Sequence, residues 1–263
     1  MNQDIKTESL SSQVFILATC RNESLLRFTT LVFDSIRVGF PSSNVTVIGN
    51  ALPDYASEAV GLACQQTNCQ FTNGPETIHH IFVEKLCGEQ HEPFILLDTD
   101  MIMYDEVESW KFDKSLAGWR IPEWKDVFTG AVTRARLHTS LLFINPVKLR
   151  AEIEVYHSQF PDTPFNPKVN LFYPLCYPFK GRGYFSDTCS MLYHAVGGQS
   201  FTERQLDAYC HFQFGTISDI VLPRLPRQDQ DNFRLARAAI LQNPARGKGA
   251  WRHQMNYYSS HPA

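Results

Sequence analysis

The sequence predicts an α/β protein with a mostly parallel central sheet flanked by helices. Three observations support this fold class: short uninterrupted apolar runs, amphipathic segments of helical period, and a regular alternation of the two through the first hundred residues. Apolar runs of this kind are typical of parallel strands that helices cover on both faces. A strand, a helix and a second strand in succession form a right-handed crossover, so the predicted strands lie side by side.

The first half of the chain predicts four strands, each rich in apolar and β-branched residues. They are expected at residues 14–19, 45–48, 69–72 and 94–97. Between them, apolar residues at helical spacing predict helices at residues 22–38, 53–66 and 75–87. Asn22 is expected to cap the first of these helices with its side chain.

The second half has fewer helices, which predicts a smaller antiparallel part beside the parallel sheet. Strands are expected at residues 116–120, 139–144 and 209–214. Residues 158–186 are rich in proline, and a loop of this length inside a compact domain is often a lid or binding loop. The tail from Arg224 to Arg252 carries seven basic and two acidic residues, with a helix expected near residues 230–241.

Composition excludes several classes of protein. The sequence has no run of 18 apolar residues, as a transmembrane helix would need, and its polar first 13 residues do not resemble a signal peptide. The seven cysteines are scattered and form no CxxC pair, so we expect reduced thiols rather than a zinc knuckle. The net charge of −3 gives no general attraction to nucleic acid or membranes. These features favour a cytoplasmic enzyme.

The motif Asp98-Thr99-Asp100 follows the apolar strand at residues 94–97. Ligands of open α/β sheets gather at the carboxyl ends of strands, and buried carboxylates there need a counter-charge. Residues two apart on a strand face the same side, about 6.6 Å apart along the chain, so both carboxylates can serve one site. Hard oxygen ligands favour Mg²⁺ or Mn²⁺. The alternative is that one carboxylate only caps the segment beginning at Met101.

This arrangement resembles the GT-A class of glycosyltransferases, in which four apolar residues and an Asp-x-Asp motif follow a nucleotide-binding α/β sheet. Residues 14–19, 44–49 and 94–100 occur here in the same order. The resemblance implies that Asp98 and Asp100 bind Mn²⁺ or Mg²⁺. The ion would hold the diphosphate of a nucleotide-sugar donor, with a UDP-linked sugar as one candidate.

A third metal ligand is expected at His211. Family 8 glycosyltransferases carry a late His-aromatic pair followed closely by Gly, and His211, Phe212 and Gly215 have that spacing. The resemblance implies that His211 completes the metal shell, and two carboxylates with one imidazole suit Mn²⁺. The Lys-Pro-Trp that often follows is absent, with Thr-Ile-Ser at residues 216–218. The alternative readings are a half-buried strand histidine at this position, or His253 or His261 as the ligand.

Two further segments resemble the part of this class that holds the sugar and the acceptor. In the strand at residues 139–145, Leu141 stands where glycine is usual and His138 or Thr139 where asparagine is usual; the resemblance implies that Ser140 faces the donor sugar. Asp187 opens an apolar helical stretch. It would act as a general base or stabilise an oxocarbenium-like state, unless it is an ordinary helix N-cap.

Four side chains are expected to contact the donor nucleotide. Thr19 and Arg21 follow the first strand, where members of this class meet the base and ribose. Lys85 lies thirteen residues before Asp98, where relatives place a cation toward the diphosphate. Lys180 belongs to the proline-rich segment that would close over the phosphates and exclude water. Each is also explained by a solvated surface charge or polar residue.

The sequence therefore predicts a metal-dependent glycosyltransferase made of a single domain, residues 1–263. We divide it into a nucleotide-sugar-binding half at residues 1–105, an acceptor and catalytic half at 106–223, and a basic extension at 224–263. The acceptor, whether saccharide, lipid-linked glycan, protein or nucleic acid, is open. The basic extension either packs on the domain or contacts a phosphate-bearing acceptor.

Three other functions remain as alternatives. A haloacid-dehalogenase-like phosphatase carries its Asp-x-Asp after the first strand, whereas here about ninety residues precede the motif. A sugar nucleotidyltransferase has a glycine-rich loop after the first strand, but residues 18–22 contain no glycine. A non-catalytic nucleotide-sugar binder would share the fold and lack the catalytic groups.

Overall fold

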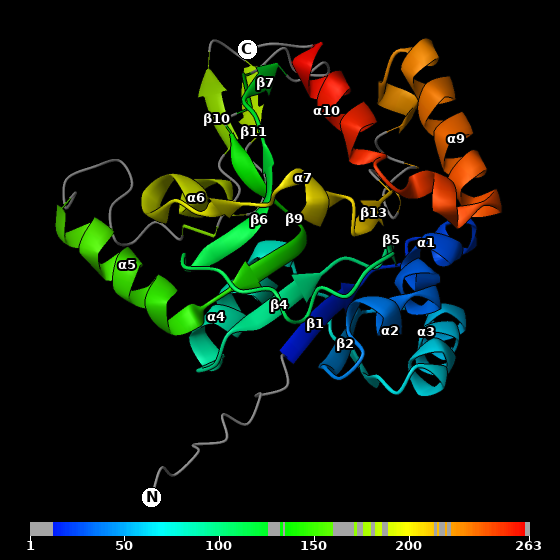
Figure 1. The fold of residues 1–263 in the computed structure, drawn as a ribbon, viewed down its shortest axis with the longest axis horizontal. Coiled ribbons are helices and arrows are strands. Elements are labelled where there is room, and N and C mark those ends of the chain that lie inside the picture. Colours follow the sequence, from blue (N-terminus) through cyan, green and yellow to red (C-terminus); the bar gives the residue numbers. More distant parts are fainter. Residues whose placement is uncertain are drawn as a thin grey trace, which may run out of the picture.

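The computed structural model describes residues 13–125, 132–133, 135–159, 171–172, 176–179, 182–185, 189–212, 215, 219 and 222–260. Their centre is a seven-stranded sheet in which one strand, β9, runs antiparallel to its neighbours and the other strands are parallel (Figure 1). In spatial order the strands are β12 (Gln199–Ser200), β6 (Leu116–Ile121), β9 (Arg136–Ile144), β4 (Phe94–Leu97), β1 (Gln13–Ala18), β2 (Asn44–Asn50) and β3 (Gln70–Gly74). The predicted mostly parallel α/β sheet is confirmed.

Three two-stranded antiparallel sheets accompany the central one, as expected for the second half of the chain. They are β5 (Met101–Met103) with β13 (Tyr209–His211), β7 (Trp124–Lys125) with β8 (Val132–Thr133), and β10 (Cys176–Phe179) with β11 (Arg182–Phe185). The first of these matters most, because it joins the segment after β4 to a segment more than a hundred residues later.

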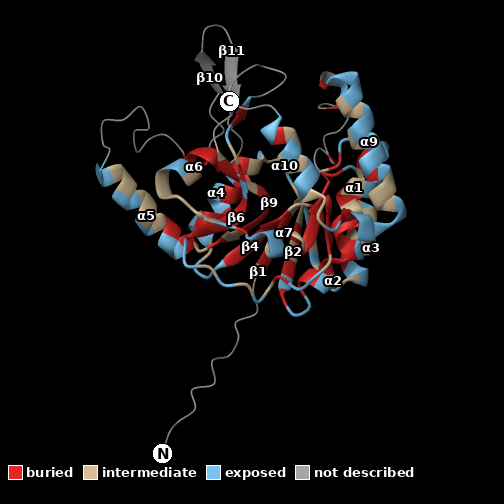
Figure 2. Cartoon of the chain, turned by 45° about the horizontal axis from the view of Figure 1, so that its top comes forward, coloured by how far each residue is buried: buried red, intermediate tan, exposed pale blue. Residues whose placement is uncertain are grey.

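Helices cover both faces of the sheet (Figure 2). They are α1 (Leu26–Thr30), α2 (Ile36–Gly39), α3 (Asp54–Gln66), α4 (His79–Glu89), α5 (Pro146–Gln159), α6 (Ser190–Val196), α7 (Glu203–Leu206), α9 (Arg227–Gln242) and α10 (Trp251–Ser259), with short 3₁₀ turns at Glu23–Leu25, Leu31–Asp34, Leu222–Arg224 and Pro244–Gly247. Successive residues of β1 belong to different core clusters: Ile16 packs with residues of α2 and α3, and Phe15 with residues of α4 and α5. Burial on both faces explains the uninterrupted apolar runs.

The helix predicted at residues 22–38 is wrong as a single element. It is divided into two 3₁₀ turns and two short α-helices. The backbone N–H of Val32 donates to the Thr99 carbonyl (2.9 Å), and the Ser35 hydroxyl oxygen accepts from the Met103 N–H (2.8 Å). The predicted cap is also wrong, since the Asn22 side chain makes no cap hydrogen bond and donates to Asp219 instead (3.1 Å).

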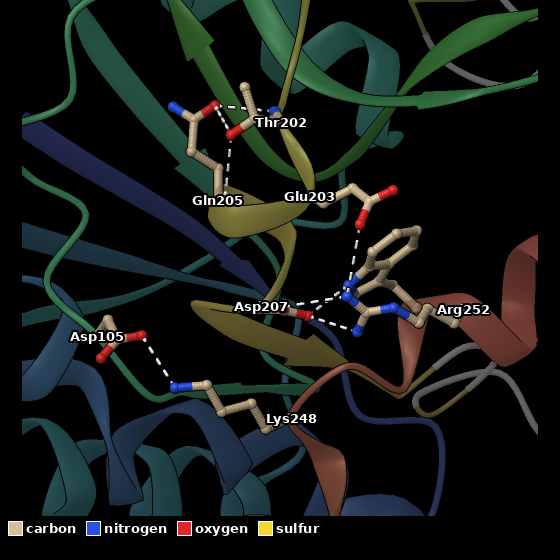
Figure 3. A network of polar contacts seen from close by, with 8 residues as sticks. Asp105, Thr202, Glu203, Gln205, Asp207, Lys248 and Arg252 are labelled. Atoms are coloured by element: carbon tan, nitrogen blue, oxygen red, sulfur yellow. Dashed lines mark hydrogen bonds and ion pairs between the residues drawn. The ribbon is translucent and has the colours of Figure 1, made fainter.

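The basic extension folds back on the domain. Tyr258 of α10 contacts Trp124 of β7, with ring centroids 5.2 Å apart. Figure 3 shows two ion pairs that hold the extension to the rest of the domain. Arg252 donates to both carboxylate oxygens of Asp207 (2.8 and 3.2 Å), and the Lys248 ammonium lies 3.4 Å from the Asp105 carboxylate. Among the described residues, no helix is both long and apolar enough to cross a membrane.

Candidate metal centre

Three distant segments fix the backbone of Asp98-Thr99-Asp100 between β4 and β5. The Asp98 N–H donates to the carbonyl of Ser140 on β9, at 2.9 Å. The Thr99 carbonyl accepts from Val32, and the Asp100 carbonyl accepts from the N–H of Phe212, each at 2.9 Å. Because each residue of the motif makes a backbone hydrogen bond to a distant segment, the fold fixes the backbone from which both carboxylates project.

His211 faces these two carboxylates. It pairs with Met101 in the small β13–β5 sheet, which brings it next to the motif. Its Nε2 atom lies 3.5 Å from Oδ1 of Asp100 and 4.0 Å from Oδ2 of Asp98. The side chains of His211 and Asp100 are buried, at 7% and 6% exposed, whereas that of Asp98 is 29% exposed. The three residues predicted as metal ligands therefore lie together.

Gly215 explains the His-Phe-x-x-Gly spacing. Its N–H donates to the Phe212 carbonyl (2.7 Å), so the chain turns tightly over Asp100. A Cβ atom at this position would lie 2.4 Å from Oδ2 and 2.7 Å from Cβ of Asp100. Because nothing larger than hydrogen fits there, glycine lets the turn close against the carboxylate.

A second imidazole adjoins the cluster. The ring of His138, on β9, lies 4.7 Å from that of His211 and stacks on Trp119 at 5.6 Å between centroids. One possible ligand atom of Asp98, one of His138 and one of His211 all lie within 4.8 Å of one another. The Nδ1 atom of His138 accepts from the Ser140 N–H (3.1 Å), so a neutral ring carries its proton on Nε2.

The two imidazoles have opposite electrostatic surroundings. Burial alone lowers the pKa of His211, but the charge and hydrogen bond of Asp100, with the charge of Asp98, raise it above the ordinary value. Burial, His211 and Arg136 hold the pKa of His138 well below the ordinary value. These effects favour the neutral form of His138 and the protonated form of His211.

The chemistry of this donor set fits a divalent cation. Metal bonds of about 2.0–2.2 Å place neighbouring ligand atoms about 3 Å apart and opposite ones about 4.3 Å apart. The distances of 3.5 and 4.0 Å from His211 to the carboxylates fall within that range. Within the described residues, however, the ligand atoms that all lie within 4.8 Å of one another belong to Asp98, His138 and His211, and Asp100 is outside this group. A mixed set of carboxylates and imidazole suits Mn²⁺ better than an all-oxygen set would.

The other predicted site residues are distributed unevenly around this cluster. Thr19 and the exposed Arg21 follow β1, at the same edge of the sheet as Asp98. Lys85 is not brought there: it is exposed in the C-terminal half of α4 and pairs with Glu89 at 3.8 Å. Ser140 is fully buried, and its backbone rather than its hydroxyl contacts the motif and His138. Asp187 and Lys180 lie outside the described residues.

Sequence reasoning assigned no metal-site role to His138. It noted this residue only as a substitute for an asparagine, and its proximity to His211 depends on the β4–β9 and β5–β13 pairings. His79, at the start of α4, also lies close enough for its charge to lower the pKa of His138. A polar hollow lined by Arg37, Ser43 and Gln70 lies at the amino ends of β2 and β3, and none of its lining residues belongs to the cluster.

Comparison with known proteins gives only distant likenesses. No family model and no curated protein matches the sequence. Among solved structures, the glycosyltransferase GlyE of Streptococcus pneumoniae TIGR4 is 11% identical with a TM-score of 0.44, covering 82% of this chain and 53% of its own. The bifunctional glycosyltransferase WbbM is 10% identical with a TM-score of 0.47, covering 90% of this chain and 45% of its own.

A third structure, the mannosyltransferase PcManGT from Pyrobaculum calidifontis in complex with GDP-Man and Mn²⁺, is 13% identical with a TM-score of 0.35. That match covers 95% of this chain and 85% of the other. The chain spans about half the length of the GlyE and WbbM structures. At these identities and TM-scores, the likenesses are too distant to assign an activity to this chain.

Proposed function

We propose that this chain is a metal-dependent GT-A glycosyltransferase that moves a sugar from a nucleotide-diphosphate donor to an acceptor hydroxyl. The observation that carries the proposal is the convergence of Asp98, Asp100 and His211 at the carboxyl end of β4. Sheet ligands bind at that edge, and the Asp-x-Asp and His-Phe-x-x-Gly patterns meet there although over a hundred residues separate them in sequence.

Asp98, Asp100 and His211 would hold Mn²⁺, or Mg²⁺ as the harder alternative. A bound ion would act as a Lewis acid that stabilises the charge on the leaving diphosphate. The chain's own contribution is positional. The external hydrogen bonds to residues 98–100 and the Gly215 turn keep the carboxylates from moving when the donor binds and leaves.

His138 would serve as a neutral hydrogen-bond donor rather than a metal ligand. Its Nδ1 lone pair is used by the Ser140 N–H, which leaves the Nε2–H directed to other partners. A low pKa and the stacking on Trp119 keep this ring uncharged and fixed. The Nε2–H of His138 would donate a hydrogen bond to an oxygen of the nucleotide-sugar or of the acceptor substrate. Because the ring is neutral, it would not repel the metal ion.

The remaining roles follow the sequence prediction. Thr19 and Arg21 would contact the nucleotide, and Asp187 would act on the acceptor hydroxyl or stabilise an oxocarbenium-like state. Lys180 would lie in a lid that excludes water. The division at residues 105 and 223, the single-domain organisation and the cytoplasmic location belong to the same proposal.

The test is a thermal-shift screen of UDP- and GDP-sugars, each with and without Mn²⁺, on wild type, Asp100→Asn and Asp105→Asn. Asp105 is a matched control, because its exposed carboxylate pairs with Lys248 outside the cluster. We expect stabilisation only when Mn²⁺ and a nucleotide-sugar are both present, lost in Asp100→Asn and kept in Asp105→Asn. Sugar-dependent release of nucleoside diphosphate should follow the same pattern.

Stabilisation that needs no metal would contradict the proposal, as would full activity of Asp100→Asn. Release of orthophosphate from simple phosphate esters would favour the phosphatase alternative. GDP-mannose, which PcManGT binds with Mn²⁺, belongs in the panel beside UDP-glucose and UDP-galactose.

A further inference from the structure

Arg237 of α9 is a buried cation. It is 8% exposed, and its Nε and Nη2 atoms have no hydrogen-bond partner within the part of the chain that the structure describes. Its guanidinium carbon lies 5.6 Å from the centre of the Phe28 ring. Arginine keeps its charge under these conditions, because burial lowers its pKa only to about 10 while the charge of Asp100 acts in the opposite direction.

This burial contrasts with the rest of the helix. Arg234, one turn earlier, is 58% exposed and pairs with Asp231 at 3.8 Å. Burying guanidinium nitrogens without hydrogen-bond partners is costly, and proteins that keep such a group usually give it a partner. The ring of Phe28 supplies only part of that compensation. The Nε and Nη2 atoms of Arg237 therefore keep their N–H donors for a ligand.

Two aromatic rings, those of Phe28 and Phe212, connect Arg237 to the candidate metal centre. Phe28, over which it lies, contacts Phe212 with ring centroids 5.9 Å apart. Phe212 directly follows His211 and donates its N–H to the Asp100 carbonyl. The charges also interact: Asp100 raises the pKa of Arg237, and Arg237 lowers the pKa of His211.

The charges indicate what kind of ligand completes the site. A divalent cation balances the carboxylates of Asp98 and Asp100, so Asp100 no longer compensates Arg237. The buried guanidinium then needs an anion close to the metal. A diphosphate bound to the metal provides one, and its oxygens match the forked N–H geometry of arginine.

We propose that Arg237 binds the diphosphate of the donor nucleotide beside the metal. The inference rests on the proposed function and adds a residue of the basic extension to the donor site. It gives part of that extension a role inside the domain, toward the donor, rather than on the surface toward a polyanionic acceptor.

The test uses the full chain with Arg237→Gln and Arg237→Lys, and Arg234→Gln as the matched control on the same helix. Isothermal titration measures Mn²⁺ alone, and then UDP and GDP at saturating Mn²⁺. For Arg237→Gln we expect nucleotide binding to weaken by about tenfold to a hundredfold, the range for a lost hydrogen bond to a charged group. Arg237→Lys should lose less, and Arg234→Gln should match wild type.

Two readouts separate ligand binding from a structural role. Removing a cation beside the carboxylates should leave Mn²⁺ binding unchanged or tighter. At saturating Mn²⁺ without nucleotide, it should also not lower the melting temperature, because the guanidinium is then a buried charge that Asp100 no longer compensates. Weaker Mn²⁺ binding together with a lower melting temperature in both Arg237 variants would overturn the inference. So would unchanged nucleotide affinity in Arg237→Gln. If wild type binds neither nucleotide with Mn²⁺, the proposed function itself fails.

Discussion

Replacing Gly215 with alanine tests whether the Asp100 carboxylate holds a metal. The new methyl would lie 2.4 Å from Oδ2 and 2.7 Å from Cβ of Asp100, and 2.9 Å from the Phe212 carbonyl oxygen. Favourable contacts between carbon atoms begin at about 3.5 Å, so the carboxylate or the turn must move by about 1 Å. Overpacking of this size costs about 1–3 kcal/mol in the free energy of unfolding.

A displacement of that size is large compared with a metal–oxygen bond of about 2.1 Å. We therefore expect Mn²⁺ affinity to fall by about tenfold to a hundredfold, as when the supports of other metal ligands are removed. Isothermal titration with Mn²⁺ measures the affinity, and circular dichroism confirms that the variant folds.

Gly88→Ala is the control, because Gly88 is exposed on α4 and its Cβ would meet nothing within 4 Å. That variant should keep the wild-type Mn²⁺ affinity and gain about 0.5–1 kcal/mol of stability, since alanine is favoured over glycine in a helix. Unchanged Mn²⁺ binding in a folded Gly215→Ala protein would refute the assignment of Asp100 as a ligand.

Three further predictions concern other contacts. Burial raises the pKa of Glu108, but hydrogen bonds from the hydroxyls and the backbone N–H groups of Ser42 and Ser43 lower it below the ordinary value; Glu108→Gln should therefore lower stability by about 1.5–3 kcal/mol in urea unfolding at pH 7. This difference should be complete above the ordinary carboxyl pKa and disappear as pH falls through the lowered pKa of Glu108; a constant difference down to pH 3 would contradict it. Asp207→Asn removes the charge that holds Arg252 and Trp251, so limited proteolysis should cleave near residues 243–260 faster than in wild type; an unchanged rate would show that other contacts hold the segment. His138→Phe keeps a ring against Trp119 but removes the donor, so turnover should fall while Mn²⁺ affinity is retained; equal loss of Mn²⁺ affinity would make His138 a ligand instead.

The parts of the fold that were predicted from the sequence depend on local patterns. The buried parallel strands β1, β2 and β4 each come from one continuous apolar run, so their signal lies within the segment itself. The division of residues 23–39 into four short helical segments has no local signal. It involves Val32 donating to Thr99, a partner that only the folded sheet brings close.

The candidate site likewise contains residues that a local motif predicts and residues that only the fold brings to the site. Asp98, Asp100 and His211 could be named because each sits in a short motif, and the structure brings them together. His138 and Arg237 carry no motif of their own. One depends on the register of β9 against β4, and the other on how α9 packs over Phe28, so neither position can be calculated from spacing along the chain.

The attachment of the C-terminal segment has a consequence for biosynthesis. The Gln254 side chain donates to the His211 carbonyl (2.8 Å), and Arg252 and Trp251 bind Asp207 shortly before β13. A ribosome makes these residues after every expected metal ligand, and domains fold as their chain emerges. A nascent chain could therefore form the parallel sheet and the β13–β5 pair early, but the contacts of the C-terminal segment that support His211 form only after residue 254 is released. Translation arrest before that point should give a folded core that binds Mn²⁺ poorly.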